Sequence, residues 1–391
     1  MYLALNMTNI NKKEIDFLIS NEFYQSILSI SLFISILIIF LKFFSYKNKS
    51  HSKNFNKNEI LDLMGNTPII YIKSLSKLTG HNIYAKCEYF SYYSSKDRII
   101  KRILLSAKEQ GKLKKETMIY ENSTGLSGYS TACISHLLGY NSTIVLPDTC
   151  NKSLISQIKK TNCKLILTKD VDFSNFSNNY IRLCKQISEQ DKNAFYLNLY
   201  QNELNYITHF EETANELYKQ LNGKIDAFVC GADTGGTIAG LSNFLKNQNK
   251  NCFVALADIP GSGFDSYVKE GVLFRQERKE EKKEILTHIG KGNCFLNNNF
   301  RKAIINDSYI CNYNEVMFII DYLKENDEIN IGFKEGINLV GILKMIKNNK
   351  NLPKNANIAT IFLDNGLYDS EINSNYNKEM NDIKDINQIY K

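Results

Sequence analysis

From Glu59 onward, short apolar runs alternate with stretches of helical periodicity, and this alternation limits the fold more than any other feature of the sequence. The runs have the length and residue types of buried strands, and the stretches between them are long enough for a helical crossover. The pattern predicts an α/β fold with parallel sheets flanked by helices. Expected strands include 82–88, 118–120, 143–146, 164–167, 227–230, 252–256 and 358–363, and expected helices include 99–110, 127–138, 153–161, 206–221 and 238–247.

The 391 residues divide by composition into five parts. Residues 1–22 are polar, whereas 23–45 contain an uncharged apolar centre and, with its flanks, reach the roughly 20 residues of a transmembrane helix. A buried core helix or a cleaved signal peptide are the alternatives, but the late start and the lack of a small-residue cleavage site favour a retained anchor. We expect a basic tether at 46–58, the main α/β domain at 59–372 and a frayed C-terminal tail at 373–391.

Lysines follow the apolar segment, while the side before it is nearly balanced in charge. The positive-inside tendency therefore predicts a single-pass membrane protein whose main domain faces the cytosol. A moderate apolar length with a basic flank suits the mitochondrial outer membrane or the endoplasmic reticulum.

Composition argues against two other classes of function. The formal charge of +7 comes from scattered lysines, and no basic stripe with interleaved aromatic residues marks a nucleic-acid partner. The nine cysteines form no C-x-x-C pair and no cluster with histidines at zinc-like spacing. We therefore expect reduced thiols, no metal site and no nucleic-acid binding.

The first stretch with chemical potential is Ser94-Ser95-Lys96-Asp97-Arg98, which lies between the expected strand 82–88 and the expected helix 99–110. A lysine at such a junction sits beside a positively polarised helix end and loses its proton more easily. Its amine can then act as a nucleophile that forms a Schiff base. A solvated surface triplet is the alternative for this stretch alone.

Two further stretches each follow an expected strand and open a helix. Asp233-Thr234-Gly235-Gly236-Thr237 directs backbone N–H groups at one point, which suits a phosphate, although a turn without a ligand would look the same. The second stretch offers hydroxyls and N–H groups to a carboxylate, or else simply caps its helix. Its candidate residues are Ser123, Thr124, Gly125 and Ser127.

Together with Gly65-Asn66-Thr67-Pro68 and Lys86-Cys87-Glu88, these stretches resemble, in order and spacing, the fold type II pyridoxal-phosphate-dependent enzymes. The resemblance covers about four-fifths of the chain and is closest to the cysteine synthase and cystathionine β-synthase family, in particular a membrane-anchored cysteine-synthase-like branch. It implies a two-lobed fold similar to the tryptophan synthase β-subunit, with pyridoxal 5'-phosphate as cofactor. A homodimer is also implied.

The resemblance also implies an activity and its residues. Lys96 would hold the cofactor as a lysine aldimine and then act as the catalytic base. O-acetylserine, or a related O-activated serine, would react with sulfide to give cysteine by β-replacement. The phosphate would be bound by Thr234, Gly235, Gly236 and Thr237, and the substrate carboxylate by Ser123, Thr124, Gly125 and Ser127.

Four positions depart from the family pattern. Leu126 replaces an asparagine that contacts the cofactor ring, and Leu199 replaces a glutamine that contacts the substrate carboxylate. Asp233 replaces the first glycine of the phosphate stretch, and Lys334 replaces the serine at the pyridine nitrogen. These degenerate motifs leave a second hypothesis open, a pseudoenzyme that keeps the fold as a binding or scaffold protein. A serine/threonine dehydratase using the same lysine is a third.

Overall fold

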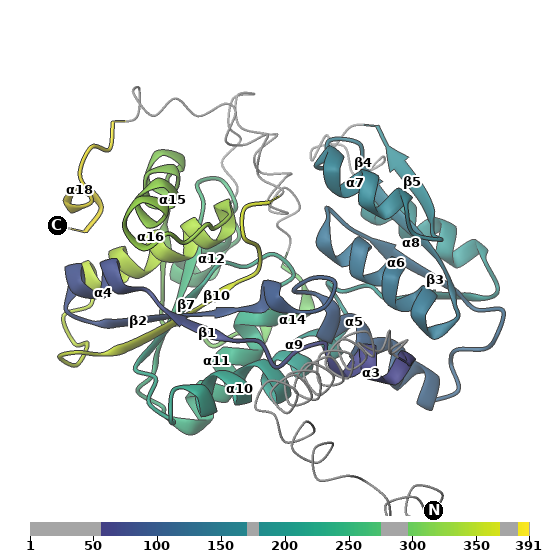
Figure 1. The fold of residues 1–391 in the computed structure, drawn as a ribbon, viewed down its shortest axis with the longest axis horizontal. Helices are drawn as coiled ribbons and strands as arrows, with labels where there is room; N and C mark the ends of the chain where they lie inside the picture. The colour runs from purple at the N-terminus through teal and green to yellow at the C-terminus, as the bar shows by residue number, and fades with distance from the viewer. Residues whose placement is uncertain (1–55, 170–179, 275–295, 368–381, 391) are drawn as a thin grey trace, which may run out of the picture. The chain divides into compact units, whose positions relative to one another are not determined.

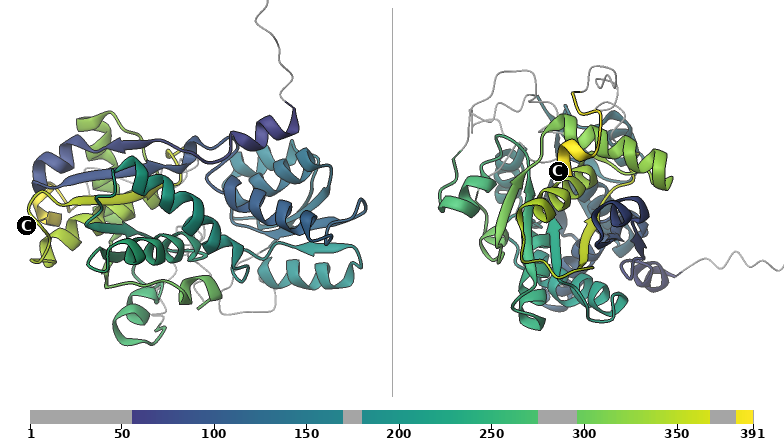
Figure 2. Two further views of the ribbon diagram at one scale, coloured as in Figure 1. Left: turned by 90° about the horizontal axis from the view of Figure 1, so that it is seen from below. Right: turned by 90° about the vertical axis from the view of Figure 1, so that its left-hand side faces the viewer.

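The computed structural model describes residues 56–169, 180–274, 296–367 and 382–390. Their strands form two sheets, as expected from the alternating pattern. The large sheet has six strands in the order β1-β2-β10-β7-β8-β9, and the small sheet has four in the order β5-β4-β3-β6. All neighbouring strands pair in parallel except β1 and β2. The left-hand view of Figure 2 shows β3–β6 and their helices, in blue and teal, as a group of their own.

The large sheet is built from β1 (Ile69–Tyr71), β2 (Asn82–Cys87), β7 (Ala227–Cys230), β8 (Phe253–Asp258), β9 (Asp307–Ile310) and β10 (Asn357–Phe362). The small sheet is built from β3 (Met118–Asn122), β4 (Asn141–Pro147), β5 (Lys164–Thr168) and β6 (Ala194–Tyr196). The longer strands lie within two residues of the predicted runs, whereas β1, β6 and β9 were not predicted.

Helices connect and cover these strands (Figure 1). Those of the first half are α3 (Lys57–Asp62), α4 (Lys73–Thr79), η1 (Glu88–Phe90), α5 (Asp97–Glu109), α6 (Leu126–Leu138), α7 (Lys152–Lys159) and α8 (Tyr180–Gln190). Those of the second half are α9 (Leu204–Thr208), η2 (His209–Thr213), α10 (Ala214–Gln220), α11 (Gly236–Gln248), α12 (Phe264–Glu270), α14 (Asn298–Arg301), α15 (Tyr313–Asp327), α16 (Phe333–Asn348) and α18 (Asn387–Tyr390).

The large sheet buries both of its faces, as a parallel sheet with continuous apolar strands should. In β7, Ala227 and Val229 pack with α15 and α16 on one face, whereas Phe228 and Cys230 pack with α10 and α11 on the other. Figure 1 shows these helix pairs on opposite sides of the strands. The parallel arrangement brings the carboxyl ends of β2, β7 and β10 to one edge, where ligands bind in such sheets.

The structure of the described residues can be compared with three further expectations from the sequence. The frayed tail is wrong for its last part, because α18 packs against α16 and buries Ile386 and Ile389 in the apolar core. No disulfide joins the described cysteines. The predicted anchor at 23–45 lies outside the described residues; within them, no helix combines the length and hydropathy of a membrane span.

Candidate active site

A cavity of about 610 Å³, including the open solvent at its mouth, lies at the carboxyl ends of β7 and β10. It contains the predicted amine and three of the four predicted phosphate-binding residues. Its wall is formed by Lys96, Cys230, Gly231, Ala232, Asp233, Thr234, Gly235, Thr237, Ile238, Lys334, Ile337, Asn338, Ile361 and Leu363. Two stretches separated by more than a hundred residues are therefore joined in one concave site.

Lys96 immediately precedes α5, as the strand-to-helix pattern predicted. The loop in front of it is fixed by the buried carboxylate of Asp97, which accepts hydrogen bonds from the Tyr93 and Ser94 amides at 2.7 and 3.0 Å. Ser130 of α6 donates to the same carboxylate at 2.6 Å. These contacts fix the start of α5 to α6 of the small-sheet lobe. They orient Lys96 toward the cavity described above, at the edge of the large sheet.

The surroundings of Lys96 favour its neutral amine. Burial lowers the pKa of Lys96 below its usual value, and the nearby Lys334 ammonium lowers it further. The carboxylates of Asp233, Glu88 and Glu335 oppose this shift without reversing it. A lowered pKa increases the share of the neutral amine, which is the form that attacks an aldehyde.

The stretch 233–237 forms a tight turn that opens α11. Gly235 has φ +79°, and a Cβ there would lie 2.6 Å from the backbone of Phe300, so only glycine fits. Thr234 and Thr237 line the cavity beside the positive end of the α11 dipole. Asp233 also lines the cavity, and the buried Tyr200 hydroxyl donates to its carboxylate at 3.2 Å.

The predicted carboxylate-binding loop is arranged differently from the phosphate stretch. Ser123, Thr124, Gly125 and Ser127 are not among the residues that line the described cavity. The Ser123 hydroxyl oxygen accepts the amides of Gly125 and Gly128 at 2.8 and 2.9 Å and pairs with the Ser127 hydroxyl. It therefore holds the loop together, and its role in substrate binding stays a prediction.

The two leucines that replace polar residues both contact apolar clusters. Leu126 packs against the cluster of α6, β4 and α7 that includes Leu154. Leu199 is buried with residues of α5, such as Ile99 and Leu104. Neither side chain supplies a hydrogen-bond donor, and packing energy explains why leucine is accommodated at both positions.

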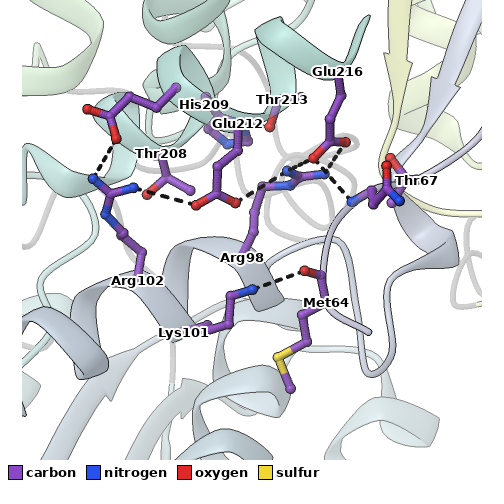
Figure 3. Close-up of polar contacts among 12 residues, drawn as sticks. Met64, Thr67, Arg98, Lys101, Arg102, Thr208, His209, Glu212, Thr213 and Glu216 are labelled. Carbon is purple, nitrogen blue, oxygen red and sulfur yellow. Dashed lines mark hydrogen bonds and ion pairs between the residues drawn. The ribbon is translucent and has the colours of Figure 1, made fainter. Parts of the chain in front are cut away.

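A buried ion-pair network lies directly behind Lys96. Arg98 donates to both oxygens of Glu88, through Nε at 2.7 Å and Nη2 at 2.9 Å, and through Nη1 to Glu216 at 2.8 Å. Lys86 also contacts Glu216, at 2.8 Å. Figure 3 shows Glu212 and Glu216 converging on the Arg98 guanidinium. The network joins β2, α5 and α10, so it holds the lysine-bearing helix against the large sheet.

Comparison with known proteins assigns this arrangement to a family. Residues 60–364 match the family model described as pyridoxal-phosphate dependent enzyme. The chain belongs to this family. It is similar to the cysteine synthase of Dictyostelium discoideum, with 32% identity over 342 residues, 85% of this chain and 89% of that protein.

Two further relatives agree with this assignment. Cysteine synthase 2 of Schizosaccharomyces pombe is 30% identical over 324 residues, which cover 79% of this chain and 81% of that protein. The crystal structure of a hydrogen sulfide-producing enzyme from Fusobacterium nucleatum superimposes with a TM-score of 0.68 at 26% identity, over 80% of this chain and 99% of that one. The two-lobed α/β fold is thus that of a fold type II enzyme, and pyridoxal 5'-phosphate is its cofactor.

The residues of this pyridoxal-phosphate-dependent enzyme suit that cofactor. Its cavity offers an amine of lowered pKa for an aldehyde, and a glycine turn with two hydroxyls for a phosphate. Lys334, at the start of α16, also faces the cavity, so a second cation is available to an anionic or basic group there.

Some residues of the site were missed at the level of sequence. Asn338 lines the cavity and bridges two strand ends, accepting from the Gly231 amide at 2.7 Å and donating to the Ile361 carbonyl at 2.8 Å. Asn205 and His209, which contact the phosphate stretch, were also missed. His209 lies in the helix predicted at 206–221 and Asn205 directly before it, so their spacing of four residues was the available signal.

Proposed function

We propose that this protein is a β-replacement enzyme of the cysteine synthase type, which takes an O-activated serine such as O-acetylserine and replaces its leaving group with sulfide to give cysteine. The observation that supports it best is the single cavity that contains both the Lys96 amine and the threonine-glycine turn at 234–237. Similarity to cysteine synthases over most of the chain supports the substrate class.

Each group of residues in the site would have a separate role in this reaction. The bound cofactor supplies an electron sink for the substrate carbanion. Lys96 Nζ would hold the cofactor and, once released, take the proton from the substrate Cα, for which a lowered pKa suits it. Thr234, Gly235, Gly236 and Thr237 would bind the phosphate, and the loop at 123–127 would face the substrate carboxylate.

The test uses the purified full chain with pyridoxal 5'-phosphate. Borohydride reduction followed by peptide mass spectrometry is expected to find the cofactor on Lys96, and Lys96→Ala to lose both the adduct and the visible absorption. Lys108→Ala, on the exposed end of α5, is the matched control and should behave like wild type. Cysteine formation from O-acetylserine and sulfide then tests the reaction. An adduct on another lysine, or none, would contradict the assignment of Lys96.

A second candidate, the pseudoenzyme, is favoured by the positions that depart from the family pattern. Leu126 and Leu199 contact apolar clusters, and the Ser123 hydroxyl is engaged within its own loop. A protein that binds the cofactor but gives no spectral change with O-acetylserine, and no cysteine with sulfide, would be this second candidate.

We propose further that residues 23–45 anchor the enzyme in a membrane with the catalytic domain toward the cytosol, and that the protein is a homodimer. The uncharged apolar segment and the lysines after it support the anchor. Extraction of cell membranes with alkaline carbonate tests it: an anchored chain stays in the pellet, and a chain found in the supernatant contradicts it. Analytical ultracentrifugation of the purified protein tests the dimer.

A further inference from the structure

Two buried side chains contact the threonines of the phosphate stretch from behind. Asn205 of α9 donates from Nδ2 to Thr234 Oγ1 at 3.0 Å. His209, at the start of η2, has its Nε2 atom 3.2 Å from Thr237 Oγ1. Both side chains are almost fully buried, and neither is among the residues that line the described cavity.

The approach is possible because the helix that contains these residues lies unusually close to α11. A Cβ on Gly236 would lie 2.0 Å from Asn205 Oδ1, and one on Gly240 would lie 2.5 Å from the Cβ of His209. The helix also widens into a π-helical turn at His209–Thr213. Such turns are rare and often occur at functional sites.

The direction of the Asn205 hydrogen bonds is fixed by a backbone carbonyl. The same Nδ2 atom lies 2.9 Å from the carbonyl oxygen of Leu199. A carbonyl can only accept, so the atom between it and Thr234 must be the amide nitrogen, with one hydrogen for each neighbour. Thr234 Oγ1 therefore accepts, and its own hydrogen remains for another acceptor. Within the described residues its hydroxyl makes no other hydrogen bond.

His209 can act on Thr237 in the same way. Burial lowers the pKa of His209 well below its usual value, and Lys96 and Arg98 lower it further against the opposing Glu216, so the ring is neutral. A neutral ring has one N–H. Its Nδ1 atom lies 2.9 Å from the Thr213 hydroxyl, which can donate to it. In the tautomer in which Nδ1 accepts from Thr213, Nε2 has the hydrogen and donates to Thr237, so the hydroxyl hydrogen of Thr237 remains for another acceptor.

We propose that Asn205 and His209 are positioning residues that turn the hydroxyl hydrogens of Thr234 and Thr237 toward the phosphate of the cofactor. The inference rests on the proposed role of the 234–237 stretch as the phosphate site. Phosphate oxygens are acceptors, so a hydroxyl that already accepts an N–H from behind has its donor ready for them. Hydrogen bonds in such a chain also strengthen one another.

The experiment compares pyridoxal 5'-phosphate with pyridoxal, which lacks the phosphate, as ligands of the purified full chain. Wild type should prefer the phosphorylated aldehyde. Asn205→Leu and His209→Met should each lose about tenfold or more of this preference, with pyridoxal affinity nearly unchanged. His209→Gln is the matched rescue variant, because its side-chain amide can place an N–H near the position of Nε2, and it should stay close to wild type.

Two results would overturn the inference while leaving cofactor attachment intact. One is an unchanged preference in folded Asn205→Leu and His209→Met. The other is a wild type that binds both aldehydes equally well, which would remove the phosphate site itself. A wild type that binds neither aldehyde would overturn the proposed function, and the inference with it.

A measurement on wild type covers the case in which these variants fail to fold. The ¹⁵N spectrum of the histidine-labelled protein reports which ring nitrogen of His209 has the hydrogen. The His209 signal is assigned with His209→Gln or, if that variant is also unfolded, by its proximity to Thr237. A protonated Nε2 supports the inference. An unprotonated Nε2, which would accept from Thr237, overturns it for His209.

Discussion

Replacing Arg98 by methionine is expected to lower the free energy of unfolding by about 3–5 kcal/mol, because the change leaves a buried carboxylate without its cation. The side chains of Arg98 and Glu88 are each 1% exposed. Without the guanidinium, Glu88 keeps a hydrogen bond from the Thr67 hydroxyl at 2.5 Å, and Glu216 keeps Lys86. Methionine fills much of the vacated volume, so the cost is mainly electrostatic.

A second estimate of the cost of Arg98→Met, from Coulomb's law, gives a similar free energy. Opposite unit charges about 4 Å apart attract by about 4 kcal/mol at an effective dielectric near 20. Arg102 provides the control, because it lies one turn later on α5 and also pairs with glutamates, Glu211 and Glu212, yet its side chain is 34% exposed. Exposed pairs of this kind contribute about 0–1 kcal/mol, so Arg102→Met should cost little.

Urea unfolding of the full chain, followed by circular dichroism, measures both variants under one condition. The double variant Arg98→Met/Glu216→Gln should lose less free energy of unfolding than its two single variants together, because each single substitution removes part of the same network. If Arg98→Met costs no more than Arg102→Met, the network does not hold α5 against the large sheet, and this account of how Lys96 is positioned is wrong.

Three further predictions follow from single residues. Gly235→Ala should lose cofactor binding and lower the free energy of unfolding in urea more than Gly271→Ala does. Both glycines have positive φ, but only Gly235 has no room for a Cβ. Equal losses of stability would contradict the close packing at Gly235. Glu216→Gln should be less stable than wild type at pH 7, with the difference shrinking as pH falls from about 4.5 toward 2. Burial raises the pKa of Glu216, but Arg98 and Lys86 outweigh burial and lower that pKa to about 2. The ion pair therefore contributes to the free energy of unfolding above this pH window, and the contribution is lost within it. A stability difference that does not depend on pH in urea titrations would refute this. Lys334→Met should raise the pKa of Lys96 and move the pH profile of cofactor attachment to higher pH, whereas an unmoved profile would show that the two amines are not coupled.

Strands with strong apolar runs were predictable because burial on both faces leaves a signal in the sequence. The run 227–230 coincides with β7. The short edge strand β9 carries Asp307 and Ser308, so its extended form depends on pairing with β8, which no local pattern shows. The helix predicted at 206–221 exists, but its π-helical turn depends on close packing against Gly240 of a distant helix.

The local geometry of the candidate site was predictable where turns and helix starts demand particular residues, as in the placement of Lys96 before α5 and of Gly235 in a tight turn. It was not predictable where a side chain has several possible partners. The Ser123 hydroxyl could face a ligand or its own loop, and the structure has it accept two loop amides. Likewise, nothing local indicates that Leu199 packs in the small-lobe core while its carbonyl orients Asn205.

The four departures from the family pattern fall on both the cofactor side and the substrate side of the site, and their placement bears on activity. On the cofactor side, Leu126, Asp233 and Lys334 replace the family's residues, although the threonines and the glycine turn at 234–237 are present. On the substrate side, Leu199 provides packing where the family has a donor, so a substrate carboxylate there would lack about one hydrogen bond, worth roughly 1–3 kcal/mol. The affinity for O-acetylserine should therefore be weaker than in an enzyme that keeps the glutamine. A protein that binds O-acetylserine tightly would refute this prediction.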